Sequence, residues 1–209
     1  MPGEPKTGRG RASRERIVER AAELFAAQGI SATSVDEVLM AAGAGKGQFY
    51  HYFRGRDELA AAVVGHRCTQ AVARLTGALG GVSSLAGLEQ ALAGFIAGFE
   101  QMGMPGCPIG TLATEVAGRN EDARLQAAAG FDAWERLLAE ALERMRQRGE
   151  LRADAEPAAL ATGLLASIEG GMVLSQTRKD IASLRIAVEA GLGPVRARLS
   201  QDTGSQSRL

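Results

Sequence analysis

One segment organises this chain: Thr33-Ser-Val-Asp-Glu-Val-Leu-Met-Ala-Ala-Gly-Ala-Gly-Lys-Gly-Gln-Phe-Tyr-His-Tyr-Phe53. It holds two short helical patterns separated by Gly43-Ala-Gly45. The first has Thr33 or Ser34 as a capping residue, two acids in its first turn and an apolar face at i, i+3, i+4 and i+7. Gly43 stands where a left-handed C-terminal residue belongs. The second pattern runs from about Lys46 to Phe53. A helix, a short glycine-containing turn and a second helix are the helix-turn-helix signature.

The second of these helices presents polar and aromatic side chains that suit DNA. Lys donates to guanine, Gln pairs with adenine through two hydrogen bonds, and Tyr, His and Arg commonly contact phosphate oxygens. We expect the following residues on or near the exposed side: Lys46, Gln48, Tyr50, His51 and Tyr52. Arg54 and Arg56 follow directly and add positive charge. The spacing alone also allows a plain helical hairpin with a solvated polar face.

The segments Gly29-Ile-Ser-Ala-Thr-Ser-Val-Asp-Glu-Val38, Ala41-Ala-Gly43 and Gly47-Gln-Phe-Tyr-His-Tyr-Phe-Arg-Gly-Arg-Asp-Glu-Leu59 carry a family resemblance. They resemble the DNA-binding domain of the TetR family of bacterial transcriptional regulators. The resemblance implies an all-α fold of about nine helices. It further implies a three-helix DNA-binding domain over residues 13–56, a larger ligand-binding and dimerisation domain over residues 57–200, and a homodimer.

The resemblance also implies roles for single residues. Base-reading positions correspond to Lys46, Gly47 and Gln48, and phosphate-contacting positions to Thr33, Tyr50, His51, Tyr52 and Arg56. One departure concerns Gly45, where many members carry Ser or Thr to cap the recognition helix. Because glycine caps less well than serine, we expect the start of this helix to fray more when DNA is absent.

Composition agrees with a helical regulator without requiring one. Of the 209 residues, 45% are apolar and 4% aromatic, which predicts a core of closely packed helices with small contacts. Lys plus Arg and Asp plus Glu are 24 each, so any basic surface is local. Residues 1–12 are rich in Pro, Gly and Arg and predict a disordered basic arm, which either lies near phosphates or only aids solubility. Ser13 is the expected cap of the first helix.

Several function classes find no support in the sequence. Two cysteines, Cys68 and Cys107, make neither a disulfide framework nor a zinc site, and the two histidines add no metal cluster. We expect no cofactor, no metal and no enzymatic activity, because no catalytic constellation stands out. No secretory h-region and no run of ~18 apolar residues are evident, which predicts a cytoplasmic protein without a membrane partner.

The middle of the chain predicts a helix over residues 56–79, which would link the DNA-binding domain to the core, and another over 85–102. Next comes Gly103-Met-Pro-Gly-Cys-Pro-Ile-Gly110, whose Gly-Cys-Pro-Ile-Gly part is similar to the LmrA-like and YxaF-like branch of the family. Pro108 suits the first turn of a helix that would run to about residue 117, with Cys107 at its start. There the helix dipole would lower the pKa of the thiol, making it a sensor of electrophiles; the alternative is a small buried cysteine.

The last part of the chain predicts helices over residues 121–148, from Pro157 onward, and after Asp180, with a disordered tail over 201–209. Gly191 and Gly193-Pro194 are expected to break or kink the last helix. Side chains with an apolar character are candidates for the ligand pocket: Phe95, Phe99, Met102, Cys107, Leu112, Phe131 and Trp134. The last two long helices pair with their copies in the family, which makes the following residues candidates for the dimer interface: Leu164, Ser167, Gly170, Gly171, Leu174, Leu184 and Val188.

Together these patterns predict a regulator, most often a repressor in this family, that a small and apolar or aromatic effector releases from a near-palindromic operator in double-stranded DNA. Two other hypotheses are a thiol-dependent helical enzyme that uses Cys107 and a helical adaptor that binds protein. The first lacks a credible base near the thiol. The second predicts that no DNA duplex is bound.

Overall fold

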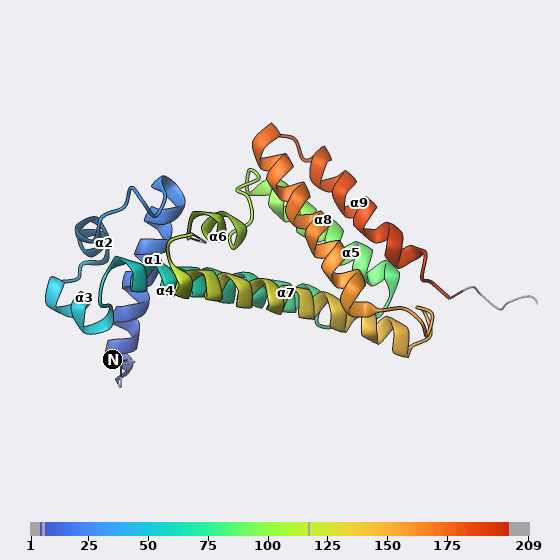
Figure 1. Ribbon diagram of the computed structural model, residues 1–209, viewed down its shortest axis with the longest axis horizontal. Coiled ribbons are helices and arrows are strands. Elements are labelled where there is room, and N and C mark those ends of the chain that lie inside the picture. Colours follow the sequence, from blue (N-terminus) through green and yellow to red (C-terminus); the bar gives the residue numbers. More distant parts are fainter. Residues whose placement is uncertain (1–4, 6, 117, 201–209) are drawn as a thin grey trace, which may run out of the picture. The chain divides into compact units, whose positions relative to one another are not determined.

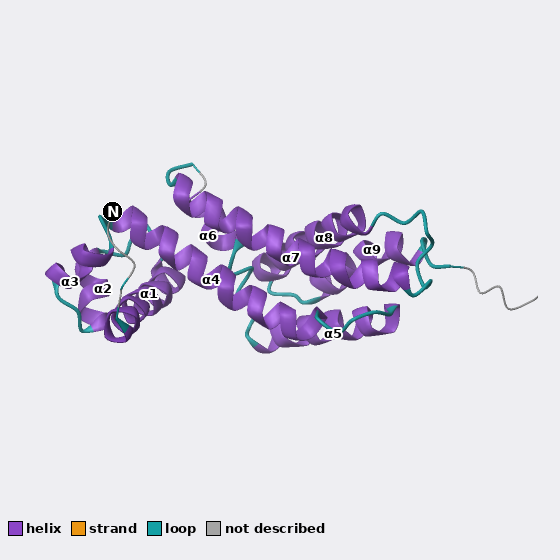
Figure 2. Cartoon of the chain, turned by 90° about the horizontal axis from the view of Figure 1, so that it is seen from below, coloured by secondary structure: helices purple, strands orange, loops and turns teal. Residues whose placement is uncertain are grey.

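The computed structural model describes residues 5, 7–116 and 118–200, and these form nine helices, which confirms the all-α prediction (Figures 1 and 2). In chain order the helices are α1 (Gly8–Gln28), α2 (Val35–Ala42), α3 (Lys46–Tyr52), α4 (Arg56–Leu79), α5 (Leu85–Gln101), α6 (Gly110–Val116), α7 (Glu121–Gln147), α8 (Pro157–Arg178) and α9 (Ala182–Arg196). One isolated antiparallel bridge pairs Leu151 with Leu199. The predicted tail, residues 201–209, lies outside the described residues.

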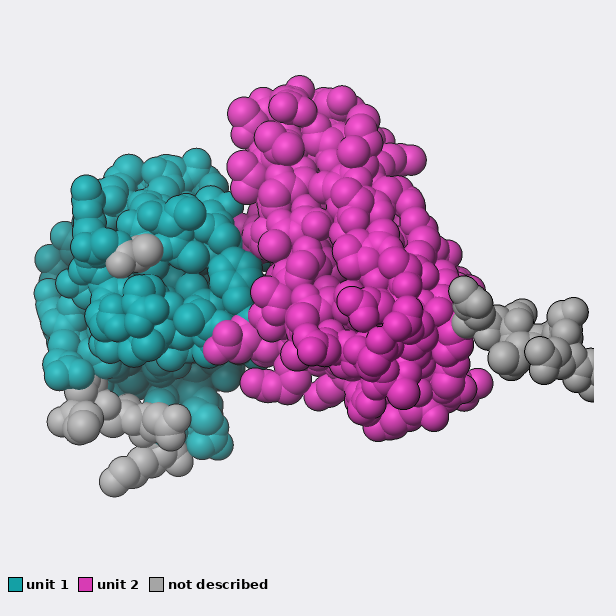
Figure 3. Space-filling model, turned by 45° about the vertical axis from the view of Figure 1, so that its right-hand side comes forward, with its two compact units in different colours: residues 1–71, 108–131 teal, residues 72–107, 132–209 magenta. Residues whose placement is uncertain are grey.

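The chain divides into two compact units (Figure 3). Unit 1 comprises residues 1–71 and 108–131, and unit 2 comprises residues 72–107 and 132–209. Helices α4 and α7 each contribute residues to both units. This division differs from the predicted DNA-binding and ligand-binding domains, whose boundaries remain predictions.

The first helix begins earlier than predicted. Thr7 caps it by accepting a hydrogen bond from the Gly10 N–H at 3.1 Å, so residues 8–12 of the predicted disordered arm are helical. Residues 1–4 and 6 of that arm lie outside the described residues. Ser13, the expected cap, is instead a buried residue inside α1. The cap prediction was therefore wrong, because Thr7 offers a hydroxyl that caps the helix six residues earlier.

The core of unit 1 is built from the apolar faces of α1 to α4. α1 packs against α2 and α3, and α3 contributes the fully buried ring of Phe49, with Phe53 directly after its last residue. The two rings lie 5.3 Å apart, centre to centre. Burying large rings of this kind contributes roughly 1.5–3 kcal/mol each. A short, seven-residue α3 is held in place by this burial and not by its own helix propensity.

Unit 2 contains the closely packed pair α8 and α9. Two glycines make the close approach possible: a Cβ on Gly171 would lie 2.8 Å from the Ala187 Cβ, and one on Gly191 would lie 2.9 Å from the Ser167 Cβ. Pro194 lies inside α9, which continues to Arg196, so the expected break at residues 191–194 does not occur. Gly191 therefore allows α9 to approach α8 closely and does not end α9.

Two further expectations need correction. α6 begins at Gly110, so Cys107 precedes the helix by three residues and does not stand at its N-terminus.

By length and composition alone, α8 could cross a membrane, contrary to the expectation that no segment could. Of the most apolar 18-residue stretch of α8, 39% is buried within the chain. The core helix of a soluble protein can have the same length and composition.

Candidate functional site

The helix-turn-helix is set by local hydrogen bonds at each helix end. Ser34 and Glu37 form a reciprocal capping box at the start of α2, and Gly43 ends that helix in the left-handed conformation (φ 58°, ψ 40°). Gly45 precedes α3 and supplies no side-chain cap, as predicted. The backbone N–H groups in the first turn of α3 therefore have no capping side chain and can bind solvent or another partner.

The outer face of α3 carries all three residues predicted to read bases and two of those predicted to contact phosphate. Lys46, Gly47 and Gln48 are exposed, as are Tyr50, which is 61% exposed, and His51. Two of these side chains already have partners within unit 1. The Lys46 ammonium lies 3.1 Å from the Asp36 carboxylate, and the Gln48 side-chain amide donates to the Ser13 hydroxyl at 2.6 Å.

Two predicted phosphate-contacting residues are buried instead. Thr33 is 2% exposed, and its hydroxyl donates to the Gly29 carbonyl at 2.8 Å and accepts from the Gln28 amide at 3.2 Å. Tyr52 is 8% exposed and packs its ring 6.3 Å from that of Phe53. The prediction that Tyr52 lies on or near the exposed side was wrong, because its ring completes the core under α3. Thr33 is buried because it closes the turn after α1.

Arg56 has a structural partner that the sequence did not indicate. Its guanidinium donates to the backbone carbonyl of Ile30, which joins the start of α4 to the loop between α1 and α2. The side chain is half-buried. Arg54 lies two residues earlier, just before α4, and its side chain is 74% exposed and pairs with Glu58 in the first turn of that helix. Of the two arginines, Arg54 is the freer to meet a phosphate.

Hydrogen bonds within unit 1 join α6 to the loop before α2, and the residue before α7 to the start of α4. Glu115 on α6 accepts a hydrogen bond from the Ser31 backbone N–H at 2.9 Å. Asn120 donates to the Asp57 carbonyl at 2.8 Å while its side-chain oxygen caps α7 at the Ala123 N–H. Polar contacts of this kind, more than 60 residues apart in sequence, carry no periodic signal that sequence reasoning could detect.

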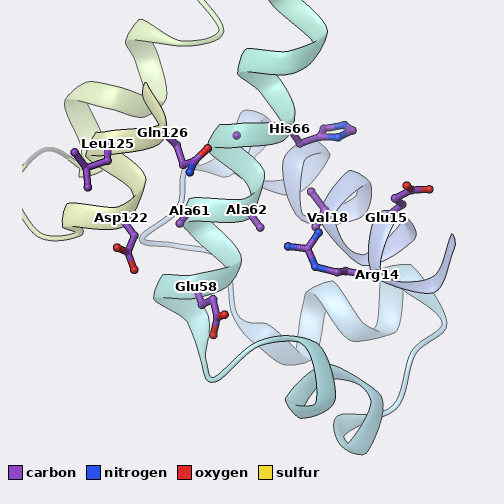
Figure 4. Close-up of a pocket in the computed structure, with 11 residues that line it drawn as sticks. Arg14, Glu15, Val18, Glu58, Ala61, Ala62, His66, Asp122, Leu125 and Gln126 are labelled. Carbon is purple, nitrogen blue, oxygen red and sulfur yellow. The ribbon is translucent and has the colours of Figure 1, made fainter. Parts of the chain in front are cut away.

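A groove of about 570 Å³ lies elsewhere on unit 1 (Figure 4). It runs along α4, with α1 on one side and α7 on the other, over a floor of Val18, Ala61 and Ala62. Carboxylates of Glu58 and Asp122 and the ring of His66 stand around it. None of the lining residues is among those predicted for a binding site.

Within unit 2, three of the predicted effector residues come together. The Phe95 ring lies 6.5 Å from that of Phe99 and 5.8 Å from that of Trp134. Phe99 and Trp134 are buried, whereas Met102 is 68% exposed and therefore lies outside this cluster's core. Leu112 and Phe131, also predicted for the pocket, belong to unit 1.

Cys107 is buried beside a carboxyl group that the sequence analysis did not single out. Its thiol and the carboxyl of Glu169 on α8 form a hydrogen bond. Burial raises the pKa of Glu169, and the bond from Cys107 opposes that rise. One carboxyl oxygen, Oε1, is fully buried and has no hydrogen-bond partner within the described part of the protein. Buried oxygens of this kind are uncommon, because the lost hydration is not replaced.

The predicted dimer residues fall into two groups. Leu164, Gly171, Leu184 and Val188 are buried within the chain's own α8–α9 pair, so their prominence reflects packing inside one chain. Gly170 and Leu174 are exposed, and Ser167 is half-buried. An apolar surface continues around them through Val173, which is 56% exposed, and on α9 through Ile186, which is 69% exposed.

Comparisons with known proteins agree with this geometry. Residues 17–63 match the family model for bacterial regulatory proteins of the tetR family, and residues 84–190 match the transcriptional regulator LmrA/YxaF-like C-terminal domain. The HTH-type transcriptional regulator YxaF of Bacillus subtilis is 31% identical over 185 residues, which cover 85% of this chain and 92% of YxaF. The transcriptional regulator AcuR of Cereibacter sphaeroides is 29% identical, with 83% of each chain covered. A crystal structure of a regulatory protein TetR from Rhodobacter sphaeroides superposes with a TM-score of 0.73 at 26% identity, covering 90% of this chain and 99% of that one.

The fold and the exposed face of α3 thus define a helix-turn-helix transcriptional regulator. The chain belongs to the TetR family, and its C-terminal part belongs to the LmrA/YxaF-like branch. Members of this family are typically ligand-responsive repressors that bind DNA. The relatives are regulators and not enzymes, and no finding favours the thiol-dependent enzyme or the protein adaptor.

Proposed function

We propose that this protein is a homodimeric repressor that a small molecule releases from a near-palindromic operator. The observation that carries the proposal is the outer face of α3, where Lys46, Gly47 and Gln48 are exposed on a helix anchored by the buried Phe49. Lys and Gln match the hydrogen-bonding edges of guanine and adenine in the major groove. Tyr50, His51, Arg54 and Arg56 would add phosphate contacts.

A dimer would place two such helices about one DNA turn apart, ~34–36 Å, on two half-sites. The exposed apolar surface of α8 and α9 around Gly170, Val173, Leu174 and Ile186 is the proposed interface, because a second copy would remove it from water. This pairing also accounts for the apolar composition of α8 in a protein that acts in the cytoplasm. Changing Leu174 to Glu should yield monomers in light scattering; an unchanged dimer would place the interface elsewhere.

The proposed effector site is the aromatic cluster of unit 2 together with Cys107 and Glu169. Phe95, Phe99 and Trp134 offer apolar ring faces, and the unpartnered Oε1 of Glu169 offers an acceptor to a hydrogen-bond donor. An apolar or aromatic effector with one donor group fits this chemistry. Because Trp134 is the only tryptophan, its fluorescence reports binding directly.

Release follows if the effector binds more tightly to a state with a different separation of the two recognition helices. Effector and operator must then weaken each other's binding by the same factor. The bonds that join Glu115 to the loop before α2 and Asn120 to the start of α4 support α6 and α7 as the connection.

Random-site selection with the full-length protein tests the DNA-binding proposal. We expect an inverted repeat, and we expect Gln48→Ala to relax base preference at one position in each half-site. Recovery of no preferred duplex would favour the protein-adaptor hypothesis. A recovered operator that Gln48→Ala reads like the wild type would show that Gln48 does not read bases.

A further inference from the structure

A side chain of α1 touches the recognition helix at the residue proposed to read a base. The Gln48 amide nitrogen donates a hydrogen bond to the Ser13 hydroxyl at 2.6 Å. Ser13 is 5% exposed and lies 35 residues earlier in the chain, whereas Gln48 stands on the exposed face of α3. An exposed glutamine ordinarily samples many rotamers, so this bond restricts a side chain that would otherwise be free.

The bond leaves the groups that read DNA available. A glutamine amide has two N–H donors and one carbonyl acceptor. Pairing with adenine uses one N–H and the carbonyl. Because Ser13 engages only one N–H, the second N–H and the carbonyl remain, and the bond determines which way each of them faces. A side chain already held in its binding geometry loses less entropy on binding and tolerates mismatched bases less well.

Ser13 itself is held firmly against α3. Its neighbour Arg14 places its guanidinium 5.2 Å from the centre of the Phe53 ring, just after the end of α3. One turn further along α1, Ile17 is fully buried. Arg16 donates to the Ala42 carbonyl at the end of α2, 2.9 Å away. These contacts fix α1 to both helices of the motif, so the Ser13 hydroxyl is a stationary acceptor.

We propose that Ser13 is a positioning residue that sets the base preference at the Gln48 position without contacting DNA itself. The proposal rests on the proposed function, in which Gln48 reads a base edge. Loss of the hydroxyl would leave Gln48 able to bind but free to turn its amide. The selectivity at one base pair would then fall while the affinity for the rest of the operator stayed nearly unchanged.

A double-mutant cycle on the full-length protein tests this inference. Wild type, Ser13→Ala, Gln48→Ala and the double variant are titrated against the selected operator and against operators with each base substituted, at one fixed salt concentration. Ser31→Ala is the matched control, because Ser31 is an exposed serine of the same unit whose side chain makes no hydrogen bond within the described residues. Ser13→Cys is a second variant, since it keeps the size of the side chain but accepts hydrogen bonds only weakly.

We expect Ser13→Ala and Ser13→Cys to reduce discrimination about three- to tenfold at the position that Gln48→Ala identifies, and at no other. In the Gln48→Ala background the same change should have no further effect. A uniform loss of affinity for all sequences would show that Ser13 only supports the fold and would overturn the proposal. Tighter binding by Ser13→Ala would show that the bond holds Gln48 away from its DNA-binding geometry, and this result would also overturn the proposal. If Gln48→Ala alone alters no base preference, the assignment of Gln48 fails first and this inference with it.

Discussion

The ammonium group of Lys46 lies 3.1 Å from the carboxylate of Asp36, and each side chain is 70% exposed. The recognition-helix lysine is therefore paired within its own chain before DNA arrives. An exposed pair of this kind adds little to stability, but its carboxylate competes with DNA for the same cation and repels phosphate.

Asp36→Asn should consequently tighten DNA binding about two- to fivefold at low salt, and the gain should shrink as salt rises. Fluorescence anisotropy with the operator across a salt series measures both effects. Glu23→Gln serves as the control, because Glu23 carries a similar exposed ion pair with Arg20 on α1. Weaker binding by Asp36→Asn would mean that Asp36 positions Lys46 for its contact.

Substitution of Arg56 should mainly lower stability, whereas substitution of Arg54 should mainly lower DNA affinity. Removing the Arg56 guanidinium leaves the Ile30 carbonyl with only the long bond from the Thr33 N–H at 3.4 Å, so Arg56→Ala should lower the free energy of unfolding by about 1–3 kcal/mol. Arg54→Ala should leave the melting temperature almost unchanged, weaken binding to all sequences and reduce the salt slope by about one. Thermal melts and salt-dependent titrations of both variants give the comparison. Equal melting temperatures for the two variants would contradict the structural role of Arg56.

Glu115 should affect the response to effector more than the affinity for DNA. Its bond to the Ser31 N–H joins α6 to the loop before α2. Glu115→Ala should reduce the effector's effect on operator binding about fivefold, within the usual range for residues that link two sites. The measurement is the operator affinity with and without a compound that quenches Trp134. Thr111→Ala, an exposed change on the same helix, should keep the full response.

Glu169 should make stability depend on pH. Burial raises its pKa above the ordinary value of 4.5, so the folded protein binds this proton more tightly than the unfolded chain does. The stabilisation is complete below pH 4.5 and is lost as pH rises through the folded-state pKa. Glu169→Gln removes this loss, so the variant should gain stability relative to wild type as pH rises. Urea unfolding at several pH values tests this, with the exposed Glu140→Gln as control. A stability difference independent of pH would contradict it.

Both thiols should resist alkylation in the folded protein. Cys68 and Cys107 are buried, and burial raises the pKa of Cys68 to about 11. Because α6 begins at Gly110, Cys107 lacks the helix-end position that would favour its thiolate. Iodoacetamide labelling followed by mass spectrometry at neutral pH should be slow, and unfolding in urea should make it fast. Rapid labelling of Cys107 in the native state would restore the electrophile-sensor hypothesis, which Cys107→Ser would then test by loss of aldehyde-induced release.

Local patterns were enough to predict most of the helices. The bounds of α4 agree with the prediction, and α5, α7 and α8 begin at residues 85, 121 and 157 as expected. Apolar periodicity, capping side chains and glycine at φ > 0 act over a few residues, so they can be detected in a linear sequence. The exposed face of α3 followed from the same periodicity, which places Phe49 inward and Lys46 and Gln48 outward.

Tertiary contacts decided which of those residues are available. Thr33 and Tyr52 became buried, and Arg56 acquired a backbone partner, because α1 and the start of α4 close over the motif. The packing of α1 against α3 brought Ser13 to Gln48, and packing within unit 2 brought Cys107 to Glu169. The sequence alone shows small residues clustered along α8. Only the packing of α9 showed that Ala187 and Leu184 occupy the space beside Gly171, whereas no side chain lies close to Gly170. These outcomes depend on groups distant in sequence meeting at hydrogen-bond or van der Waals distance, and no local periodicity encodes that.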